Sequence, residues 1–361
     1  MKKIKFFITP VYPYGNDHYY HEIIVLAEGF KELGYDICGN VNYWQNYKTK
    51  EYLIKESESN EYDIAIYDYR YVKSFEHLLF RNGYPNFNFD SINILVDRND
   101  WISPIWNNNF NYNIFNLILG CHTVNGFNYP KNYIPWAMGL SKRMIKSIDN
   151  TSTQSLNNHI GHNFRVWHNL RKLFVDDIKK TNNCLPVSQL LSNIPDKMNK
   201  PEEYFYYQKT TRRHNNEYYE TINSSLLFLG FGGYIETLPK IYQPYGFVDK
   251  IIRKPSYLLA KYNRYKYSFV FQWDSFRMWE LFYSNTCPIF LNFEKFNFDM
   301  PVLPNSGEHY LSVDDFSWRN FNKKLKDISK KDIADIGKNG KNWVFDNYSP
   351  KIMANKLISK I

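Results

Sequence analysis

The amino-acid sequence predicts an α/β fold with two doubly wound domains that face one another across a central cleft. Short apolar runs, too short to be helices, alternate with segments of helical length and period. This alternation is typical of strand–helix–strand units around a parallel sheet. The pattern occurs in the first half of the chain and again in the second, and 361 residues are enough for two domains of about 100–200 residues each.

The first half begins with a buried strand. Residues 4–11 form an apolar run that carries no charge after Lys5. A polar loop follows, and residues 21–33 then place apolar side chains at helical spacing, with Gly34 positioned to end the helix. Further short apolar runs predict strands at residues 36–41, 63–67, 92–96, 116–119 and 134–138.

A polar segment separates the two halves. Residues 139–161 are rich in Ser, Thr, Asn and Lys and poor in large apolar side chains, so we interpret them as a linker. We place the first domain at residues 1–150 and the second at residues 151–340. Strands of the second half are predicted at residues 164–166, 226–229, 267–271 and 288–292. Helices are predicted at residues 170–180, 275–284, 318–328, 332–346 and 350–361.

Composition and charge narrow the class of protein. The net charge of +9 suits anionic partners such as nucleotide phosphates. The basic residues are dispersed and no nucleic-acid-binding module is recognisable, so we expect no nucleic-acid partner. No apolar run reaches the length of a membrane span, and the N-terminus lacks the apolar region of a signal peptide. We expect a cytoplasmic protein and leave a peripheral contact with a membrane open.

Residues 267–291 hold the most informative pattern, a strand followed by a short helix and a second strand. Asp274 and Ser275 precede the helix, and Ser275 at the N-cap leaves backbone N–H groups free at its start. Free N–H groups and the helix dipole favour an anion such as a diphosphate. Arg277 lies in the first turn, where the dipole does not favour a cation, so we expect a phosphate or carboxylate partner. Glu280 is placed to accept hydrogen bonds from ribose hydroxyls.

The pattern Ser-Phe-Arg-x-x-Glu at residues 275–280, followed by Cys-Pro-Ile at residues 287–289, resembles the donor-binding signature of GT-B fold nucleotide-sugar glycosyltransferases of the glycan-assembly type. The resemblance implies two Rossmann-like domains and a glutamate, here Glu280, that binds the ribose of the donor. It extends to Arg277 as a phosphate ligand. The end of the chain resembles helices that cross back to the first domain in this fold, which assigns that role to residues 341–361.

One position departs from the family pattern. Many retaining members carry two glutamates eight positions apart, but the position eight residues before Glu280 is Gln272. An amide can hydrogen-bond to a sugar hydroxyl but carries no charge, so we favour an inverting transfer. The pattern also has a purely structural interpretation, because Arg277 and Glu280 are spaced i, i+3 like an ion pair on an ordinary helix.

An inverting transfer needs a base that takes the proton of the acceptor hydroxyl. The loop after the first strand would face the cleft, and its candidates are Asp17, His18 and His21. Asp97 follows a later strand at the same edge and is a further candidate. Alternatively, one histidine caps the helix and Asp97 pairs with a neighbouring arginine. The histidines lack a third ligand and the cysteines have no metal-binding spacing, so we expect no metal.

Two basic clusters lie in the second half. Arg171 lies near Arg165 and His168, and residues 212–214 read Arg-Arg-His. Each cluster either meets the diphosphate or an anionic acceptor, or lies in solvent.

The sequence therefore predicts a metal-independent enzyme without a cofactor. It would move a hexosyl or deoxyhexosyl group from a nucleotide-diphosphate sugar to an oligosaccharide or glycolipid acceptor. A nucleotide-sugar epimerase of the same fold and a non-catalytic glycan-binding protein are the alternatives.

Overall fold

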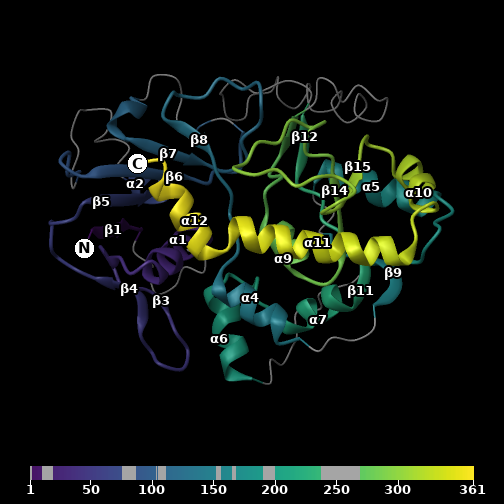
Figure 1. The fold of residues 1–361 in the computed structure, drawn as a ribbon, viewed down its shortest axis with the longest axis horizontal. Coiled ribbons are helices and arrows are strands. Elements are labelled where there is room, and N and C mark those ends of the chain that lie inside the picture. The colour runs from purple at the N-terminus through teal and green to yellow at the C-terminus, as the bar shows by residue number, and fades with distance from the viewer. Residues whose placement is uncertain are drawn as a thin grey trace.

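The computed structural model of the chain describes residues 2–9, 19–74, 87–102, 104, 111–151, 156–164, 168–189, 200–236 and 269–361. Figure 1 shows two parallel sheets, one from each half of the chain, with helices packed around them. The predicted α/β class with two Rossmann-like halves is confirmed. No helix in the described ranges combines the length and the apolar character that a membrane span requires.

The first sheet has the strand order β3-β4-β2-β1-β5-β6-β7-β8. Its strands are β1 (Lys3–Phe7), β2 (Asp36–Gly39), β3 (Tyr43–Gln45), β4 (Tyr52–Glu56), β5 (Ile64–Asp68), β6 (Ile92–Asp97), β7 (Leu117–Gly120) and β8 (Tyr133–Pro135). Neighbouring strands pair in parallel, except that β3 and β4 form an antiparallel hairpin. The strand β5 is buried along its whole length, as expected for a strand covered on both faces.

The second sheet has the strand order β10-β9-β11-β14-β15, and all its neighbours pair in parallel. Its strands are β9 (Asn157–His162), β10 (Val187–Gln189), β11 (Ser225–Leu229), β14 (Cys287–Leu291) and β15 (Leu311–Val313). Of the strand predicted at residues 164–166, Phe164 lies outside the sheet, since β9 ends at His162, and positions 165 and 166 lie outside the described residues. The strands β12 (Tyr234–Glu236) and β13 (Phe269–Phe271) form a separate antiparallel pair.

Residues 139–161, which we interpret as a linker, contain regular structure. The helix α4 (Lys142–Asp149) and the start of β9 lie within this segment. Ser141 caps the helix by accepting a hydrogen bond from the backbone N–H of Met144, and one face buries Arg143 and Met144. A short helix with one buried face has few large apolar residues, so its composition resembles that of a loop.

The remaining helices cover the sheets and connect them (Figure 1). They are α1 (His21–Glu32), α2 (Tyr69–Ser74), α5 (Asn169–Lys180), α6 (Pro201–Lys209), α7 (Asn216–Ser224), α9 (Phe276–Tyr283), α10 (Trp318–Leu325), α11 (Lys330–Tyr348) and α12 (Pro350–Ile358), with a 3₁₀ turn η1 (Tyr112–Ile114). The domain boundaries at residues 150 and 340 stay predictions.

The end of the chain joins the two halves. In Figure 1, α11 crosses the front of the view from the second sheet toward the first, and α12 packs against α1. The backbone N–H of Leu140 donates to the carbonyl oxygen of Tyr348 at 2.9 Å, where α11 gives way to α12. The segment around Leu140 is the first crossing of the chain between the halves. It is therefore hydrogen-bonded directly to the second crossing, at Tyr348.

The packing of α12 on α1 depends on Gly29. A Cβ at this position would lie 2.0 Å from the carbonyl oxygen of Pro350, which is closer than two non-bonded atoms can approach. We expect Gly29→Ala to lower the free energy of unfolding by about 1–3 kcal/mol, measured by urea denaturation. The exposed Lys31→Ala on the same helix is the control and should change it by less than about 0.5 kcal/mol. Equal effects of the two substitutions would show that this contact is not tight.

Candidate active site

The donor segment predicted from the sequence forms β13, α9 and β14. Ser275 is the N-cap residue of α9, and its side chain makes no capping hydrogen bond. The backbone N–H of Met278 donates to the carbonyl oxygen of Ser275 at 2.9 Å. The start of α9 lies at the junction of the two halves, since the ring of Phe276 lies 5.5 Å from that of Tyr19, and the unbonded N–H groups of a helix start favour an anion.

Glu280 lies on the buried face of α9. The residue is 4% exposed, and Oε1 accepts a hydrogen bond from the Tyr219 hydroxyl of α7 at 3.1 Å. Burial raises the pKa of Glu280 to about 7, against the lowering effect of Arg143 and of the bond from Tyr219. Near neutral pH this carboxyl is therefore partly protonated, and a ligand that donates to the carboxylate would favour its ionised form.

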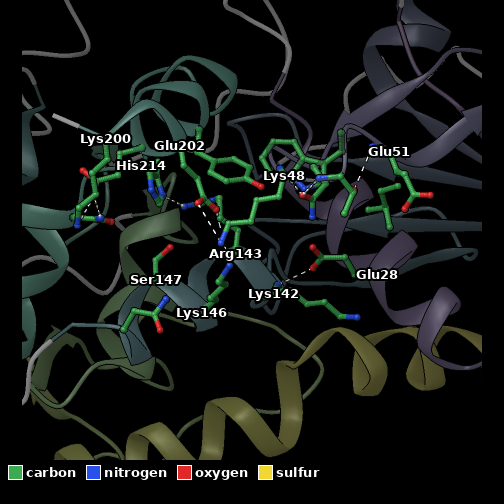
Figure 2. Close-up of a pocket in the computed structure, with 18 of the residues that line it drawn as sticks. Glu28, Lys48, Glu51, Lys142, Arg143, Lys146, Ser147, Lys200, Glu202 and His214 are labelled. Carbon is green, nitrogen blue, oxygen red and sulfur yellow. Dashed lines mark hydrogen bonds and ion pairs between the residues drawn. The ribbon is translucent and has the colours of Figure 1, made fainter. Parts of the chain in front are cut away.

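Arg143 of α4 connects the two halves through side chains (Figure 2). One of its terminal nitrogens donates to the Tyr219 hydroxyl at 3.0 Å and to Nδ1 of His214 at 2.9 Å. The other donates to the Tyr19 hydroxyl at 3.1 Å. Its guanidinium is 7% exposed, and these three partners are neutral groups. Arg143 and Glu280 share Tyr219 as a hydrogen-bond partner, and the charge of Arg143 also lowers the pKa of Glu280 through space.

His21 is fully buried at the first position of α1. Its Nε2 lies 2.9 Å from the carbonyl oxygen of Gly139, and its Nδ1 lies 2.8 Å from the Tyr19 hydroxyl. A carbonyl can only accept, so Nε2 carries the proton and Nδ1 accepts from Tyr19. Burial lowers the pKa of His21 to about 3. The ring lies 5.1 Å from that of Phe276, so the structure brings His21 to the start of the donor helix.

Tyr19, Arg143 and Tyr219 thus form one continuous chain of hydrogen bonds from His21 to Glu280. Two residues singled out in the sequence, one in each half, are the ends of that chain. The three connecting residues were not predicted, because a single Tyr or Arg carries no spacing signal in a sequence with 31 tyrosines.

Both carboxylate oxygens of Asp274 accept hydrogen bonds from other residues of the protein. Its Oδ1 accepts from Trp279 Nε1 at 2.7 Å, and its Oδ2 accepts from the backbone N–H of Met138 at 3.0 Å. The side chain is 1% exposed, and burial raises its pKa to about 7. Asp274 therefore holds α9 against the first crossing between the halves, which is a positioning role rather than direct contact with a ligand.

Arg277 reaches the carboxyl end of β9. It donates to the carbonyl oxygen of Asn163 at 2.8 Å, and its guanidinium lies 5.9 Å from the ring centroid of Phe164. Its charge also opposes the protonation of His162, whose pKa burial lowers to about 4. The cation expected from the sequence thus lies at the edge of the second sheet where ligands bind in doubly wound folds.

Gln272 and Arg171 meet at a glycine turn after β11. Gln272 has a left-handed backbone, with φ 53°, and a Cβ at Gly233 would lie 2.7 Å from its side-chain oxygen. The turn therefore packs directly on the start of the donor segment. Arg171 of α5 donates to the carbonyl oxygen of Phe231 in the same turn at 3.2 Å. Both sequence-predicted residues lie at the carboxyl edge of the second sheet.

Asp97 ends β6 and is fully buried. Its Oδ1 accepts from the backbone and side chain of Asn99, and its Oδ2 accepts from the Tyr133 hydroxyl at 3.2 Å. The carboxylate is thus occupied in shaping its own loop. The sequence alternative of an Asp97 pair with the adjacent Arg98 is not what forms.

Arg98 instead bridges two other buried carboxylates. It lies 3.6 Å from Glu22 and 3.5 Å from Asp68, and burial raises the pKa of Asp68 to about 6. This ion-pair cluster at the carboxyl edge of the first sheet was not predicted, since its members are distant in sequence.

Asp17 and His18 lie outside the described residues, as does Arg165. Among the residues that are described, no three His, Cys, Asp or Glu side chains gather closely enough to hold a metal ion.

No known family profile matches the sequence, and no curated protein matches it. The structure is similar to a solved alpha-glucosyltransferase in complex with UDP-glucose and DNA containing an abasic site, with a TM-score of 0.52 and 10% identity over 99% of this chain and 98% of that one. The chain has the GT-B fold. Other similar structures are a glycosyltransferase from Rickettsia africae (TM-score 0.48, 12% identity, 99% of this chain and 97% of that one) and Anabaena HepE in complex with UDP-glucose (0.46, 10%, 99% and 99%).

Ligands of doubly wound folds bind at the carboxyl edges of the strands. The chain of hydrogen bonds between His21 and Glu280 spans the junction of the two halves, with Arg277 and the glycine turn on its second-domain side. At 10% identity the likeness concerns the fold, and activity is argued from the residues below.

Proposed function

We propose that the protein is a glycosyltransferase that moves a sugar from a nucleoside diphosphate sugar to a hydroxyl of a glycan or glycolipid. The observation that carries this proposal is the buried carboxyl of Glu280, one turn into a helix whose N-terminus lies at the junction of two Rossmann-like domains. A carboxylate beside free helix N–H groups suits a ribose attached to a diphosphate. The net charge of +9 further supports a cytoplasmic protein whose acceptor is presented at an anionic membrane surface.

Each donor-side residue has a distinct role in this proposal. Glu280 accepts hydrogen bonds from the ribose hydroxyls. Arg277, Arg171 and the backbone N–H groups after Ser275 stabilise the charge that develops on the departing diphosphate. Gln272, next to the glycine turn, binds a hydroxyl of the transferred sugar. These groups carry the leaving-group charge, so the proposed reaction needs neither a metal nor a cofactor.

In the transfer, the acceptor oxygen forms a bond to the anomeric carbon while the bond from that carbon to the phosphate oxygen breaks. The acceptor proton passes to a base on the opposite side of the sugar. We assign this base to Asp17 or His18, which precede Tyr19 in the chain. His21 has both ring nitrogens bonded within the protein, so we propose that it positions Tyr19. An uncharged Gln272 supports inversion, because it cannot form a covalent sugar ester.

The test is incubation with UDP-glucose, chosen because the similar alpha-glucosyltransferase is described with it, and with other nucleotide sugars, each with and without a mixture of oligosaccharides. The proposal predicts acceptor-dependent release of nucleoside diphosphate. An isomerised sugar without release would identify an epimerase, and neither outcome would leave a binding protein. Transfer to DNA, which is present in that similar structure, would contradict the proposed acceptor class.

The raised pKa of Glu280 predicts that donor binding depends on pH. Burial raises this pKa to about 7, and ribose hydroxyls donate to the ionised form. The carboxyl must therefore lose its proton before binding at pH 6 but not at pH 8, so the affinity for UDP should rise about tenfold between them. Calorimetric titration measures the rise, and Glu280→Gln, which keeps the phosphate titration of UDP, is the reference. An equal pH dependence in both proteins would show that Glu280 does not titrate with binding.

A further inference from the structure

A cavity of about 660 Å³ opens beside Arg143, between the two halves of the molecule (Figure 2). The β3–β4 hairpin and α1 form one wall, and α4, α6 and the segment leading to α7 form the other. Its volume is within the range of sites that hold small organic ligands. Among the described residues, none from the donor segment at 267–291 lines this cavity, so the cavity is separate from the proposed donor site.

The charges around the cavity are mixed. Six basic and five acidic side chains are among the described residues that line it, so neither sign dominates. Lys48 of the hairpin and Lys146 of α4 approach the same carboxylate, that of Glu202, at 3.8 and 4.0 Å. Ammonium groups only donate hydrogen bonds and carboxylates only accept them. A polyhydroxylated, uncharged ligand can satisfy both, whereas a charged ligand is repelled by half of the lining.

Trp44 gives the cavity an aromatic surface held in an unusual backbone conformation. Its φ is 59°, in the left-handed region that a bulky residue rarely adopts and that costs on the order of 1–3 kcal/mol. This conformation places the indole 5.7 Å from the ring of Tyr19 and 6.0 Å from that of Tyr206. The indole thus lies between the cavity and the buried hydrogen bonds. An aromatic face packs well on the C–H face of a sugar ring.

Arg143 connects this cavity to the proposed donor site. It lines the cavity, and its guanidinium bonds to Tyr19 and Tyr219, the second of which donates to Glu280. In Figure 2, Arg143 lies centrally among the labelled residues, between His214 on one side and Glu28 on the other. A ligand in the cavity is therefore separated from the ribose carboxylate by two side chains.

We propose that this cavity is the acceptor site and that it takes an uncharged oligosaccharide, with one sugar ring against Trp44. The inference rests on the proposed glycosyltransferase function and adds the place and the chemical class of the acceptor. Thr49 offers a way to block the cavity, because it is exposed at the hairpin turn and lines the cavity. Thr49→Trp fills the space without disturbing the core, and Lys55→Trp, on an exposed position of β4 outside the lining, is its matched control.

The experiment uses the full chain saturated with UDP and a set of immobilised gluco-, galacto- and manno-oligosaccharides, each with a uronate-containing counterpart. We expect binding to at least one neutral oligosaccharide in preference to its acidic counterpart. Thr49→Trp should weaken that binding at least about tenfold, and Lys55→Trp should leave it unchanged. Trp44→Ala should weaken it as well, while UDP binding stays the same in all variants.

Several outcomes would overturn the inference. They are a preference for the acidic counterparts, no binding to any neutral oligosaccharide, and unchanged binding by Thr49→Trp. UDP binding keeps the two proposals apart. Wild-type protein that binds UDP but fails these criteria disproves the acceptor cavity alone, whereas failure to bind any nucleotide disproves the proposed function.

Discussion

Glu280→Ala is expected to weaken binding of a nucleoside diphosphate about 100-fold or more and to abolish sugar transfer, while the protein stays folded. Two hydrogen bonds from ribose hydroxyls to a charged acceptor contribute about 1.5–3 kcal/mol each, and about 1.4 kcal/mol corresponds to a factor of ten. Folding should survive, because burial raises the pKa of this carboxyl to about 7 and thus already disfavours its charged form. Calorimetric titration measures the affinity, and circular dichroism verifies the fold.

Two further substitutions make this prediction specific. Glu280→Gln retains one uncharged hydrogen-bond acceptor, so its affinity for the nucleoside diphosphate should lie between those of Glu280→Ala and wild type. Glu217→Ala removes an exposed carboxylate from α7, the helix that carries Tyr219. This variant should bind the nucleoside diphosphate as tightly as wild type. If Glu280→Ala bound the diphosphate as tightly as Glu217→Ala, the assignment of Glu280 to the ribose would be wrong.

Arg143→Met is expected to lower the free energy of unfolding by about 3–5 kcal/mol, because three buried neutral groups lose a hydrogen-bond partner at a cost of about 1–3 kcal/mol each. The guanidinium donates hydrogen bonds to Tyr19, Tyr219 and His214. Each of these buried side chains would lose a hydrogen-bond partner. Methionine keeps much of the volume, so the effect reports polar contacts rather than a cavity. Denaturant unfolding monitored by tryptophan fluorescence measures the change.

Lys146→Met, one turn further along α4 and exposed, is the control for Arg143→Met and should change stability by less than about 0.5 kcal/mol. Coupling can be measured directly by combining Arg143→Met with Glu280→Gln. Because Tyr219 bonds to both residues, the two effects should be non-additive by more than about 0.5 kcal/mol. Simple additivity would mean that the hydrogen bonds between the two halves act independently.

The fold could be predicted because local patterns determine its main elements. Strands such as β5 are continuous apolar runs, and α1 repeats its apolar positions at helical spacing. The helix α4 and the β3–β4 hairpin were not predicted, because their local patterns are weak. Their buried faces are small and their exposed positions polar, so tertiary packing rather than local pattern selects their structure. Trp44, with its left-handed backbone, contradicts local preference altogether.

The candidate site was predictable only where its residues are close in sequence. Ser275, Arg277 and Glu280 belong to one helix and could be found by their spacing. The bond from Arg143 to Tyr219 spans 76 positions and that to Tyr19 spans 124, so no spacing announces them. Asp274 shows both cases. Its position before a helix suggested a cap, whereas the structure uses it to hold Met138, 136 positions away.

A thermal-shift titration of the wild-type protein tests whether it binds a nucleoside diphosphate. A ligand that binds only the native state raises the unfolding temperature in proportion to its affinity and concentration. The expectation is that at least one nucleoside diphosphate or its sugar raises this temperature in wild type and not in Glu280→Ala, while the corresponding nucleoside has little effect. No shift with any nucleotide, or an equal shift in both proteins, would contradict it.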